Sequence, residues 1–462
     1  MQDLKNLSQK KASSAFSFLG NGRRNRRINH SSEPARPRLS FPSGKRLRQL
    51  KLALMFIAIV LALAPLCVLA LRQTESAGSH VTGWIKHVTG SGHKSAESID
   101  SNNSANRFTT ASDMLETADI SNSSVSARTP EGLQYIYTIQ GDLQQRVHDY
   151  LVKYSVPYGV FVAIEPATGR ILGMTAYSSV DPGWAKRSAY DLYPMASLFK
   201  IITASAALEN NKITPESVVE FRGKNYSENP RYWDVSPRGS NNRMNVTYAM
   251  GKSINPVYGR VASDIAGKTS VMESVSRFGF NQKLLPDTPA KPSQAGEPAD
   301  DHKLMLMGAG LDHGVKISPL HAAVIMSAIA NGGKMMAPGL TSAIIDSKGV
   351  EKEIFAPREL RQLVTPETST SLTQMLSSTV LTGTSRKAFH DRRGRPLINV
   401  SIAAKTGSID GSDPKGHYSW FAAFAPIQNP KIALVALVIN SDKWKIKASQ
   451  VGAEALYEFF RQ

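Results

Sequence analysis

Continuous and alternating apolar runs place strands at both ends of a globular region that begins near residue 131. Residues 160–165 and 171–177 are β-leaning runs joined across the turn residues 166–170, which is a hairpin pattern. Three further runs of this kind lie near the other end, at residues 402–404, 418–424 and 432–439. Residues 448–461 carry apolar positions on one helical face. Strands from both ends predict one antiparallel, five-stranded sheet packed with helices.

The middle of this region has a helical pattern. Ser318 and Pro319 have the types expected at the cap and first position of a helix whose body is LHAAVIMSAIA. Apolar residues also recur at helical spacing in SLFKIITASAALE, which begins at Ser197. Residues 221–243 and 283–298 are rich in turn-forming residues and are expected to be loops. The fold class is therefore α+β, with an all-helical subdomain beside the sheet.

The first 130 residues have a different composition. Residues 52–71 are free of charged side chains and would span roughly 30 Å as a helix, so they predict a transmembrane segment. Residues 1–51 carry 13 Lys and Arg against two acidic residues, which predicts a cytoplasmic basic tail and an extracytoplasmic bulk. Residues 72–130 contain twelve serines and are expected to form a flexible linker to one domain over 131–462.

We interpret the formal net charge of +18 as an indicator of how the chain is oriented in a membrane. Residues 1–51 hold +11 of it, since 13 basic residues face two acidic ones, so we expect no nucleic-acid partner. Cys67 is the only cysteine and lies in the apolar segment, which excludes an intramolecular disulfide. We expect a single-pass membrane protein with an extracytoplasmic domain.

A serine followed three residues later by lysine occurs four times, beginning at Ser8, Ser91, Ser197 and Ser412. Only the pair Ser197 and Lys200 opens an apolar helical run. One helical turn places both side chains on one face, beside the positive end of the helix. A buried lysine kept neutral can accept the serine proton, and backbone NH groups can hold a developing oxyanion. This pair is the candidate nucleophile and base.

A second hydroxyl, in a Ser-x-Asn pattern, occurs downstream of Lys200 at Ser227, Ser240 and Ser253. The first two lie in the loop over 221–243. Ser253 follows a helical stretch and precedes another, so Ser253 and Asn255 are expected on a firm turn between helices. We therefore select Ser253 and Asn255.

A third pattern, Lys405, Thr406, Gly407 and Ser408, ends the strand SIAAK, and it is the only Lys-(Thr/Ser)-Gly triplet in the chain. A strand edge with glycine lets a substrate backbone approach closely. Lysine and threonine offer a cation and a hydroxyl to a carboxylate, and the NH of Ser408 can complete an oxyanion hole.

These three motifs, in this order, resemble the signature of penicillin-binding proteins and serine β-lactamases. The stretches YPMASLFKIITASAALE, ISPLHAAVIMSAIANGG and AAKTGS are similar to the transpeptidase branch of this superfamily, over about residues 131–462. The resemblance implies a penicillin-binding transpeptidase fold.

The resemblance also implies a mechanism. Ser197 would attack the penultimate D-Ala carbonyl of a peptidoglycan stem peptide with Lys200 as base, and Ser253 would pass the proton to the departing D-Ala. Asn255 would bind the peptide backbone, and Lys405, Thr406 and Ser408 would bind the terminal carboxylate, with Gly407 also among the substrate-binding residues. The same serine would be acylated by β-lactams. This chemistry implies no metal and no cofactor.

Two other functions fit the same motifs. One is hydrolytic, a D,D-carboxypeptidase or a β-lactamase, because nothing in the motifs separates transfer to an amine from transfer to water. The other is a catalytically idle β-lactam sensor or scaffold. The apolar segment and the longer distance from Ser253 to Lys405 favour a membrane-anchored transpeptidase, for which a separate glycan polymerase is a candidate partner.

Overall fold

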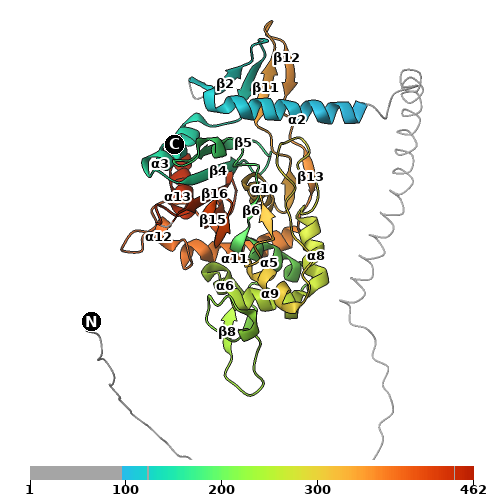
Figure 1. The fold of residues 1–462 in the computed structure, drawn as a ribbon, viewed down its shortest axis with the longest axis vertical. Helices are drawn as coiled ribbons and strands as arrows, with labels where there is room; N and C mark the ends of the chain where they lie inside the picture. The colour runs from blue at the N-terminus through green and yellow to red at the C-terminus, as the bar shows by residue number, and fades with distance from the viewer. Residues whose placement is uncertain (1–95, 122–123, 442, 462) are drawn as a thin grey trace, which may run out of the picture. The chain divides into compact units, whose positions relative to one another are not determined.

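The computed structural model describes residues 96–121, 124–441 and 443–461. Its centre is an antiparallel sheet of five strands in the order β14-β15-β16-β4-β5 (Figure 1). The strands are β4 (Tyr158–Ile164), β5 (Ile171–Tyr177), β14 (Ala403–Ser412), β15 (Lys415–Ala425) and β16 (Ile432–Asn440). The mixed α+β fold and this sheet, predicted from the hydrophobic pattern, are confirmed, and β14 and β5 form the two edges.

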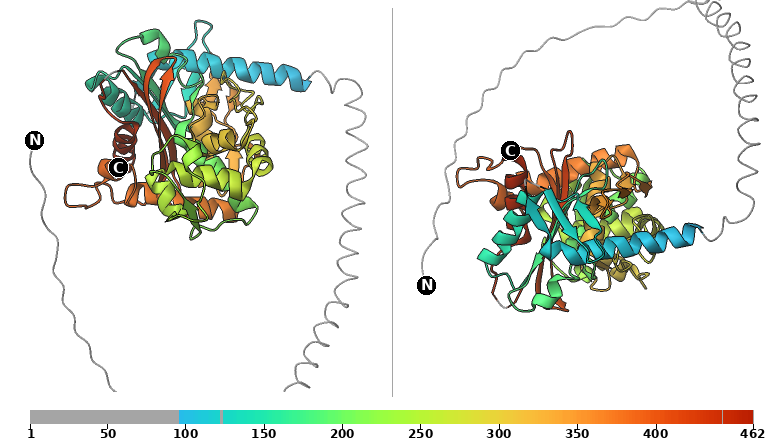
Figure 2. Two further views of the ribbon diagram at one scale, coloured as in Figure 1. Left: turned by 60° about the horizontal axis from the view of Figure 1, so that its bottom comes forward. Right: turned by 90° about the horizontal axis from the view of Figure 1, so that it is seen from above.

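Helices cover both faces of the sheet (Figure 2). The strand β16 is buried along its whole length, and alternate residues enter two different cores. Leu434 and Ala436 pack with α3 (Gly141–Lys153) and α13 (Ala448–Phe460), whereas Val435 and Leu437 pack with α10 (Pro319–Ala330). A strand that is buried on both faces is expected to have a continuous run of apolar residues, and the sequence of β16 is such a run.

The helical region surrounds α5 (Lys200–Glu209), whose residues are buried except for the last. Small side chains such as Ala204, Ala206 and Ala207 allow neighbouring helices to approach α5 closely. The surrounding elements are α6 (Val246–Lys252), α7 (Asn255–Arg260), the π-helical η4 (Val261–Ala266), α8 (Lys268–Arg277), α9 (Asp301–Ala309) and α11 (Pro366–Leu381). The helical subdomain predicted for the middle of the chain is therefore present.

A second antiparallel sheet has the order β1-β2-β3-β11-β12. Its strands are β1 (Asp119–Ser121), β2 (Ser124–Arg128), β3 (Gln134–Tyr137), β11 (Thr341–Ile345) and β12 (Glu351–Ile354). The helix α2 (Ala96–Met114) and the short η1 (Leu115–Thr117) precede it in the chain. This sheet joins the N-terminal part of the described chain to the hairpin over 341–354.

These elements differ from the flexible linker predicted for residues 72–130, which is wrong for the part after residue 95. Phe108 and Ala111 are buried, and the Tyr137 hydroxyl donates to the Ala111 carbonyl over 2.7 Å. The Ser112 hydroxyl lies 2.6 Å from that of Tyr190. The few apolar residues of this serine-rich stretch are held by partners distant in the sequence, so local composition does not reveal the structure.

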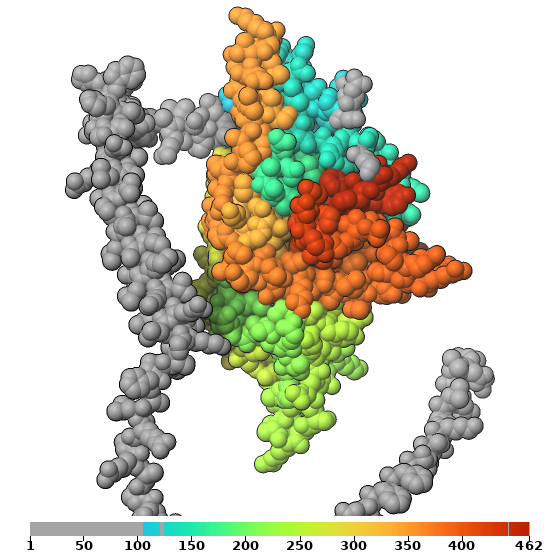
Figure 3. Space-filling view, turned by 180° about the vertical axis from the view of Figure 1, so that it is seen from behind, coloured from blue at the N-terminus to red at the C-terminus, as the bar shows by residue number. Residues whose placement is uncertain are grey.

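Short elements complete the described chain: α4 (Pro182–Ala185), β6 (Tyr193–Pro194), η2 (Ala196–Phe199), β7 (Val218–Phe221), η3 (Pro230–Tyr232), β8 (Asn242–Asn245), β9 (Lys316–Ile317), β10 (Lys334–Met336), β13 (Glu359–Gln362) and α12 (Arg386–Phe389). The strands pair as β6-β9, β7-β8 and β10-β13. The predicted loop over 221–243 is irregular except for η3 and the ends of β7 and β8, and it projects from the molecule (Figure 3). The predicted loop over 283–298 contains no helix or extended strand.

The predicted basic tail (1–51) and transmembrane segment (52–71) lie outside the described residues. Within the described ranges, no helix has the length and apolar character needed to cross a bilayer.

Candidate active site

Ser197 and Lys200 lie where the chain enters α5. Ser197 is in the 3₁₀ turn η2, and Lys200 is the first residue of α5. The Lys200 ammonium nitrogen lies 2.9 Å from Ser197 Oγ and 2.9 Å from Asn255 Oδ1, and it also donates to the Ala309 carbonyl. Lys200 is fully buried, while Ser197 keeps 8% of its surface exposed. The predicted pair therefore meets, with Lys200 fully buried and Ser197 keeping a small exposed fraction.

Burial lowers the pKa of Lys200 well below its ordinary value of 10.5, and the nearby positive charge of Lys405 lowers it further. Its three hydrogen-bonding neighbours are a hydroxyl, an amide oxygen and a carbonyl oxygen, so no carboxylate among them compensates the ammonium charge. A lysine held this way is a base that can take the Ser197 proton.

Ser253 lies in the turn between α6 and α7, and Asn255 is the first residue of α7, so both lie at the junction of two helices that the sequence predicts. Ser253 ends α6 in the left-handed conformation with a φ of 58°. This backbone conformation is uncommon for a residue with a side chain and is often found at functional sites. Ser253 Oγ accepts a hydrogen bond of 2.9 Å from Lys405 Nζ. Asn255, which is buried, joins the same site through Lys200.

Lys405 belongs to β14, and its side chain is buried. Its ammonium also donates to the Thr406 carbonyl over 2.8 Å. Burial lowers the pKa of Lys405 to about 7. Each of the two candidate hydroxyls is therefore hydrogen-bonded to a buried lysine. Ser197 is bonded to Lys200, and Ser253 is bonded to Lys405. Such paired, perturbed amines are typical of sites for proton transfer.

Gly407 allows β14 to pack directly against η2, the turn that contains Ser197. A Cβ atom there would stand 3.1 Å from Ala196 Cβ and 3.4 Å from the Ser197 nitrogen, tighter than ordinary contacts. The Trp420 indole NH, on the neighbouring β15, donates to the Pro194 carbonyl over 2.8 Å and fixes the strand to the segment before Ser197. Ser408 is exposed beyond this contact. The strand edge and the serine therefore line one site.

The structure separates the three Ser-x-Asn candidates. Ser240 is exposed in the projecting loop. The hydroxyl of Ser227 accepts from the Trp233 indole, and its carbonyl accepts from the Asn255 amide. Of the three, Ser253 is the one whose hydroxyl bonds to Lys405. In the alternative pair at Ser412, the serine faces Lys415 across a tight turn between β14 and β15, as the sequence indicates.

Two groups of this site are not predicted from the sequence. The Ala309 carbonyl carries no side-chain signal. Thr384 follows α11, and its hydroxyl lies 2.5 Å from the hydroxyl of Thr406 in β14. Thr384 belongs to no recognised motif, and only the tertiary fold brings it there. In the part of the chain that the structure describes, no cluster of three His, Cys, Asp or Glu side chains could hold a metal ion.

Comparison with known proteins finds a matching family model and several relatives of this chain. A family model for the penicillin-binding protein transpeptidase domain matches residues 159–459. The peptidoglycan D,D-transpeptidase PbpA of Mycobacterium tuberculosis is 28% identical over 353 residues, covering 68% of this chain and 69% of PbpA. Stage V sporulation protein D of Bacillus subtilis is 27% identical over 330 residues, covering 65% of this chain and 48% of that protein.

The fold has solved counterparts. The structure of penicillin-binding protein A from M. tuberculosis as an imipenem acyl-enzyme complex has a TM-score of 0.59 at 23% identity, covering 70% of this chain and 78% of that chain. This likeness supports the fold, and the family model spans well over half of the sequence. The chain therefore belongs to the family of penicillin-binding protein transpeptidase domains.

Proposed function

We propose that this protein is a D,D-transpeptidase that cross-links peptidoglycan stem peptides through an acyl-enzyme on Ser197. The observation that carries the proposal is the contact between Ser197 and Lys200. The fully buried amine of Lys200, whose pKa is lowered, lies 2.9 Å from the hydroxyl of Ser197, a residue that keeps 8% of its surface exposed. The relative PbpA of M. tuberculosis is named a peptidoglycan D,D-transpeptidase, which supports this reaction class.

Acylation begins when Ser197 Oγ attacks the penultimate D-Ala carbonyl and its proton moves to Lys200. The backbone NH groups of Ser197 and Ser408 hold the oxyanion, since donors aimed at developing charge supply much of such catalysis. The departing D-Ala nitrogen receives a proton through Ser253, whose hydroxyl is bonded to Lys405. The C–N bond breaks and the ester with Ser197 remains.

The rest of the site binds the donor peptide. Asn255 holds the peptide backbone, while Thr406 and Lys405 of the edge strand β14 bind the terminal carboxylate. An amine of a second stem peptide then takes the acyl group. β-Lactams present a similar carbonyl and carboxylate, so the same serine is acylated by them; the solved relative with imipenem is named an acyl-enzyme complex.

We further propose that residues 52–71 anchor the protein in the bacterial cytoplasmic membrane, with the described domain on the periplasmic side and a separate glycan polymerase supplying its substrate. The proposal rests on twenty uncharged positions preceded by a basic block. A reporter fused after Gln462 should be active outside the cytoplasm only. Reporter activity inside the cytoplasm would contradict this topology.

Labelling with fluorescent penicillin tests the chemistry. Ser197→Ala should abolish covalent labelling with little change in thermal stability, because the hydroxyl makes one local hydrogen bond. Lys200→Ala should lose labelling to a similar degree, because nucleophile and base act as one unit. Ser240→Ala is the matched control and should label like the parent protein. A Ser197→Ala protein that still takes the label at a specific site would disprove the mechanism.

The fate of the acyl group separates transpeptidase from hydrolase. With a stem pentapeptide as donor, added amine acceptor should divert the product from free tetrapeptide to the cross-linked peptide. Slow loss of the penicillin label is expected as well, because water is a poor acceptor in this site. Rapid loss of the label, with free tetrapeptide whatever the acceptor concentration, would assign a carboxypeptidase or β-lactamase function.

A further inference from the structure

The strand β5 forms the edge of the central sheet opposite to the edge formed by β14. Its outward main-chain groups are capped near the start of the strand. The Leu172 carbonyl accepts from the backbone NH of Gln140 over 2.9 Å. Further along, the amide side chain of Gln144 accepts from the Met174 NH over 2.8 Å and donates to the Met174 carbonyl over 2.9 Å. A strand residue would make the same two bonds, so Gln144 imitates a missing sixth strand.

The next outward position on this edge is Ala176. Because Met174 turns its NH away from β4, and no bulge lies between the two residues, Ala176 faces outward as well. It stands opposite Val160 in a pair without ladder hydrogen bonds. Within the described residues, neither its NH nor its carbonyl has a protein partner. An open donor and acceptor on a strand edge are a template for another strand.

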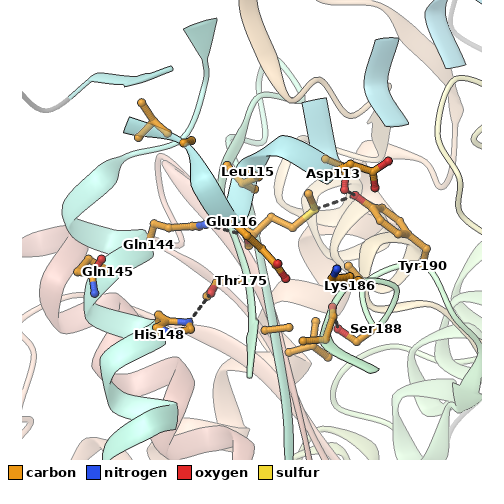
Figure 4. Close-up of a pocket in the computed structure, with 18 of the residues that line it drawn as sticks. Asp113, Leu115, Glu116, Gln144, Gln145, His148, Thr175, Lys186, Ser188 and Tyr190 are labelled. Atoms are coloured by element: carbon orange, nitrogen blue, oxygen red, sulfur yellow. Dashed lines mark hydrogen bonds between the residues drawn. The ribbon is translucent and has the colours of Figure 1, made fainter. Parts of the chain in front are cut away.

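A cavity of about 540 Å³ adjoins this open position. Its walls are η1 with the end of α2, the helix α3, and the segment over 185–190 (Figure 4). Apolar side chains contribute to its lining, among them Leu115, Val160 and Ala189. The volume is enough for one or two side chains of a bound peptide.

Charged groups stand at the rim of the cavity. Asp113 and Glu116 come from α2 and η1, and Lys186 comes from the segment opposite. Figure 4 places Glu116 between the side chains of α3 and Lys186. In the described part of the chain, neither carboxylate forms an ion pair, and the two outnumber the single lysine. The rim is therefore complementary to a ligand with an excess of positive charge.

We propose that the edge of β5 at Ala176, with the adjoining cavity, binds an extended, basic peptide segment of a partner protein as an added strand. The peptide exchanges two main-chain hydrogen bonds with Ala176, and its next residues displace the Gln144 side chain from Met174. One apolar side chain enters the cavity, and a Lys or Arg pairs with Asp113 or Glu116. Main-chain pairing supplies affinity and the alternate side chains supply specificity. The site lies four strands away from Lys405 and is independent of the acyl-transfer chemistry.

A random decapeptide library, displayed and selected on the described domain, provides the probe. Selection should enrich sequences that alternate β-branched or aromatic residues with Lys or Arg. Ala176→Pro should weaken binding of the enriched peptides by about tenfold or more, because it removes the outward NH. Proline is tolerated at an outward position of an edge strand, so penicillin labelling and the melting temperature should stay near those of the parent protein.

Charge variants test the second half of the site. Glu116→Lys should weaken the same peptides severalfold, whereas Glu351→Lys, the same change on β12 outside the cavity, should leave binding unchanged. The outcomes that overturn the proposal are a selection with no enrichment over the Ala176→Pro protein, enrichment of acidic peptides, and peptides that bind parent and Ala176→Pro proteins equally. A Ser197→Ala protein should bind these peptides normally, which separates this test from the proposed transpeptidase function.

Discussion

At the scale of single residues, the proposed mechanism depends on two buried lysines in different protonation states. In that mechanism Lys200 has to be neutral to accept the Ser197 proton, whereas Lys405 has to be cationic to bind a carboxylate. Burial lowers both pKa values, that of Lys405 to about 7 and that of Lys200 well below 10.5 with a contribution from Lys405 itself. Protonation of Lys200 removes activity as pH falls, and deprotonation of Lys405 removes it as pH rises.

The second-order rate of acylation by a carboxylate-bearing penicillin should therefore follow a bell-shaped pH profile. Its alkaline limb should begin near pH 7, where free Lys405 loses its charge. Lys405→Arg should shift this limb to higher pH, because a guanidinium stays charged. Stopped-flow acylation between about pH 5 and about pH 10 measures both limbs. A flat profile, or an alkaline limb that is unchanged in an active Lys405→Arg protein, would contradict the assignment.

At the scale of elements, the proposed oxyanion hole depends on the close approach of β14 to η2, because its two NH groups come from these elements. Gly407→Ala places a Cβ 3.1 Å from the Ala196 Cβ and 3.3 Å from the Trp420 Cβ, so these neighbours or β14 have to shift by a few tenths of an ångström. We expect the acylation rate to fall by about tenfold or more, since small misplacements at a reacting centre are costly. The melting temperature should change by only a few degrees.

Gly296→Ala is the matched control for this prediction. A Cβ at Gly296 would meet no atom within 4 Å, so this variant should acylate like the parent protein. The acylation rates of the Gly407→Ala and Gly296→Ala proteins are measured from the time course of labelling with fluorescent penicillin. An unchanged rate in Gly407→Ala would show that the strand contact does not limit the chemistry, and an equal loss in both variants would point to a general effect of the exchange.

The elements differ in how far the sequence predicts them. The strand β16 and the helix α13 are read correctly because a buried run and an amphipathic face are local patterns. The position of Ser253 is also predicted, since helical stretches flank it on both sides. Thr384 is missed because its contact with Thr406 depends on how α11 packs beside β14. Such a contact is set by tertiary structure, which local sequence does not encode.

At the scale of the whole molecule, the N-terminal elements are part of the folded domain. The strand β2 pairs with β3, and β3 pairs with β11, so residues 124–128 protect one edge of β3. The Phe108 ring contacts Tyr190 edge to face, with 6.4 Å between the ring centroids. The serine-rich composition of this stretch suggests that it could be removed without harm, whereas its contacts indicate the opposite.

A chain that begins at Glu131 should accordingly be less stable than one that begins at Gly92. Loss of α2, β1 and β2 removes the burial of Phe108 and Val125, which costs about 1.5–3 kcal/mol for each side chain. It also exposes the edge of β3, which favours aggregation. Thermal unfolding of the two proteins should differ by several degrees or more, and the shorter one should lose penicillin labelling at a lower temperature. Phe108→Ala in the longer chain should give a smaller decrease in the same direction. Equal melting temperatures for the two chains would show that α2, β1 and β2 do not stabilise the fold. This segment would then act as the flexible linker that its composition predicts.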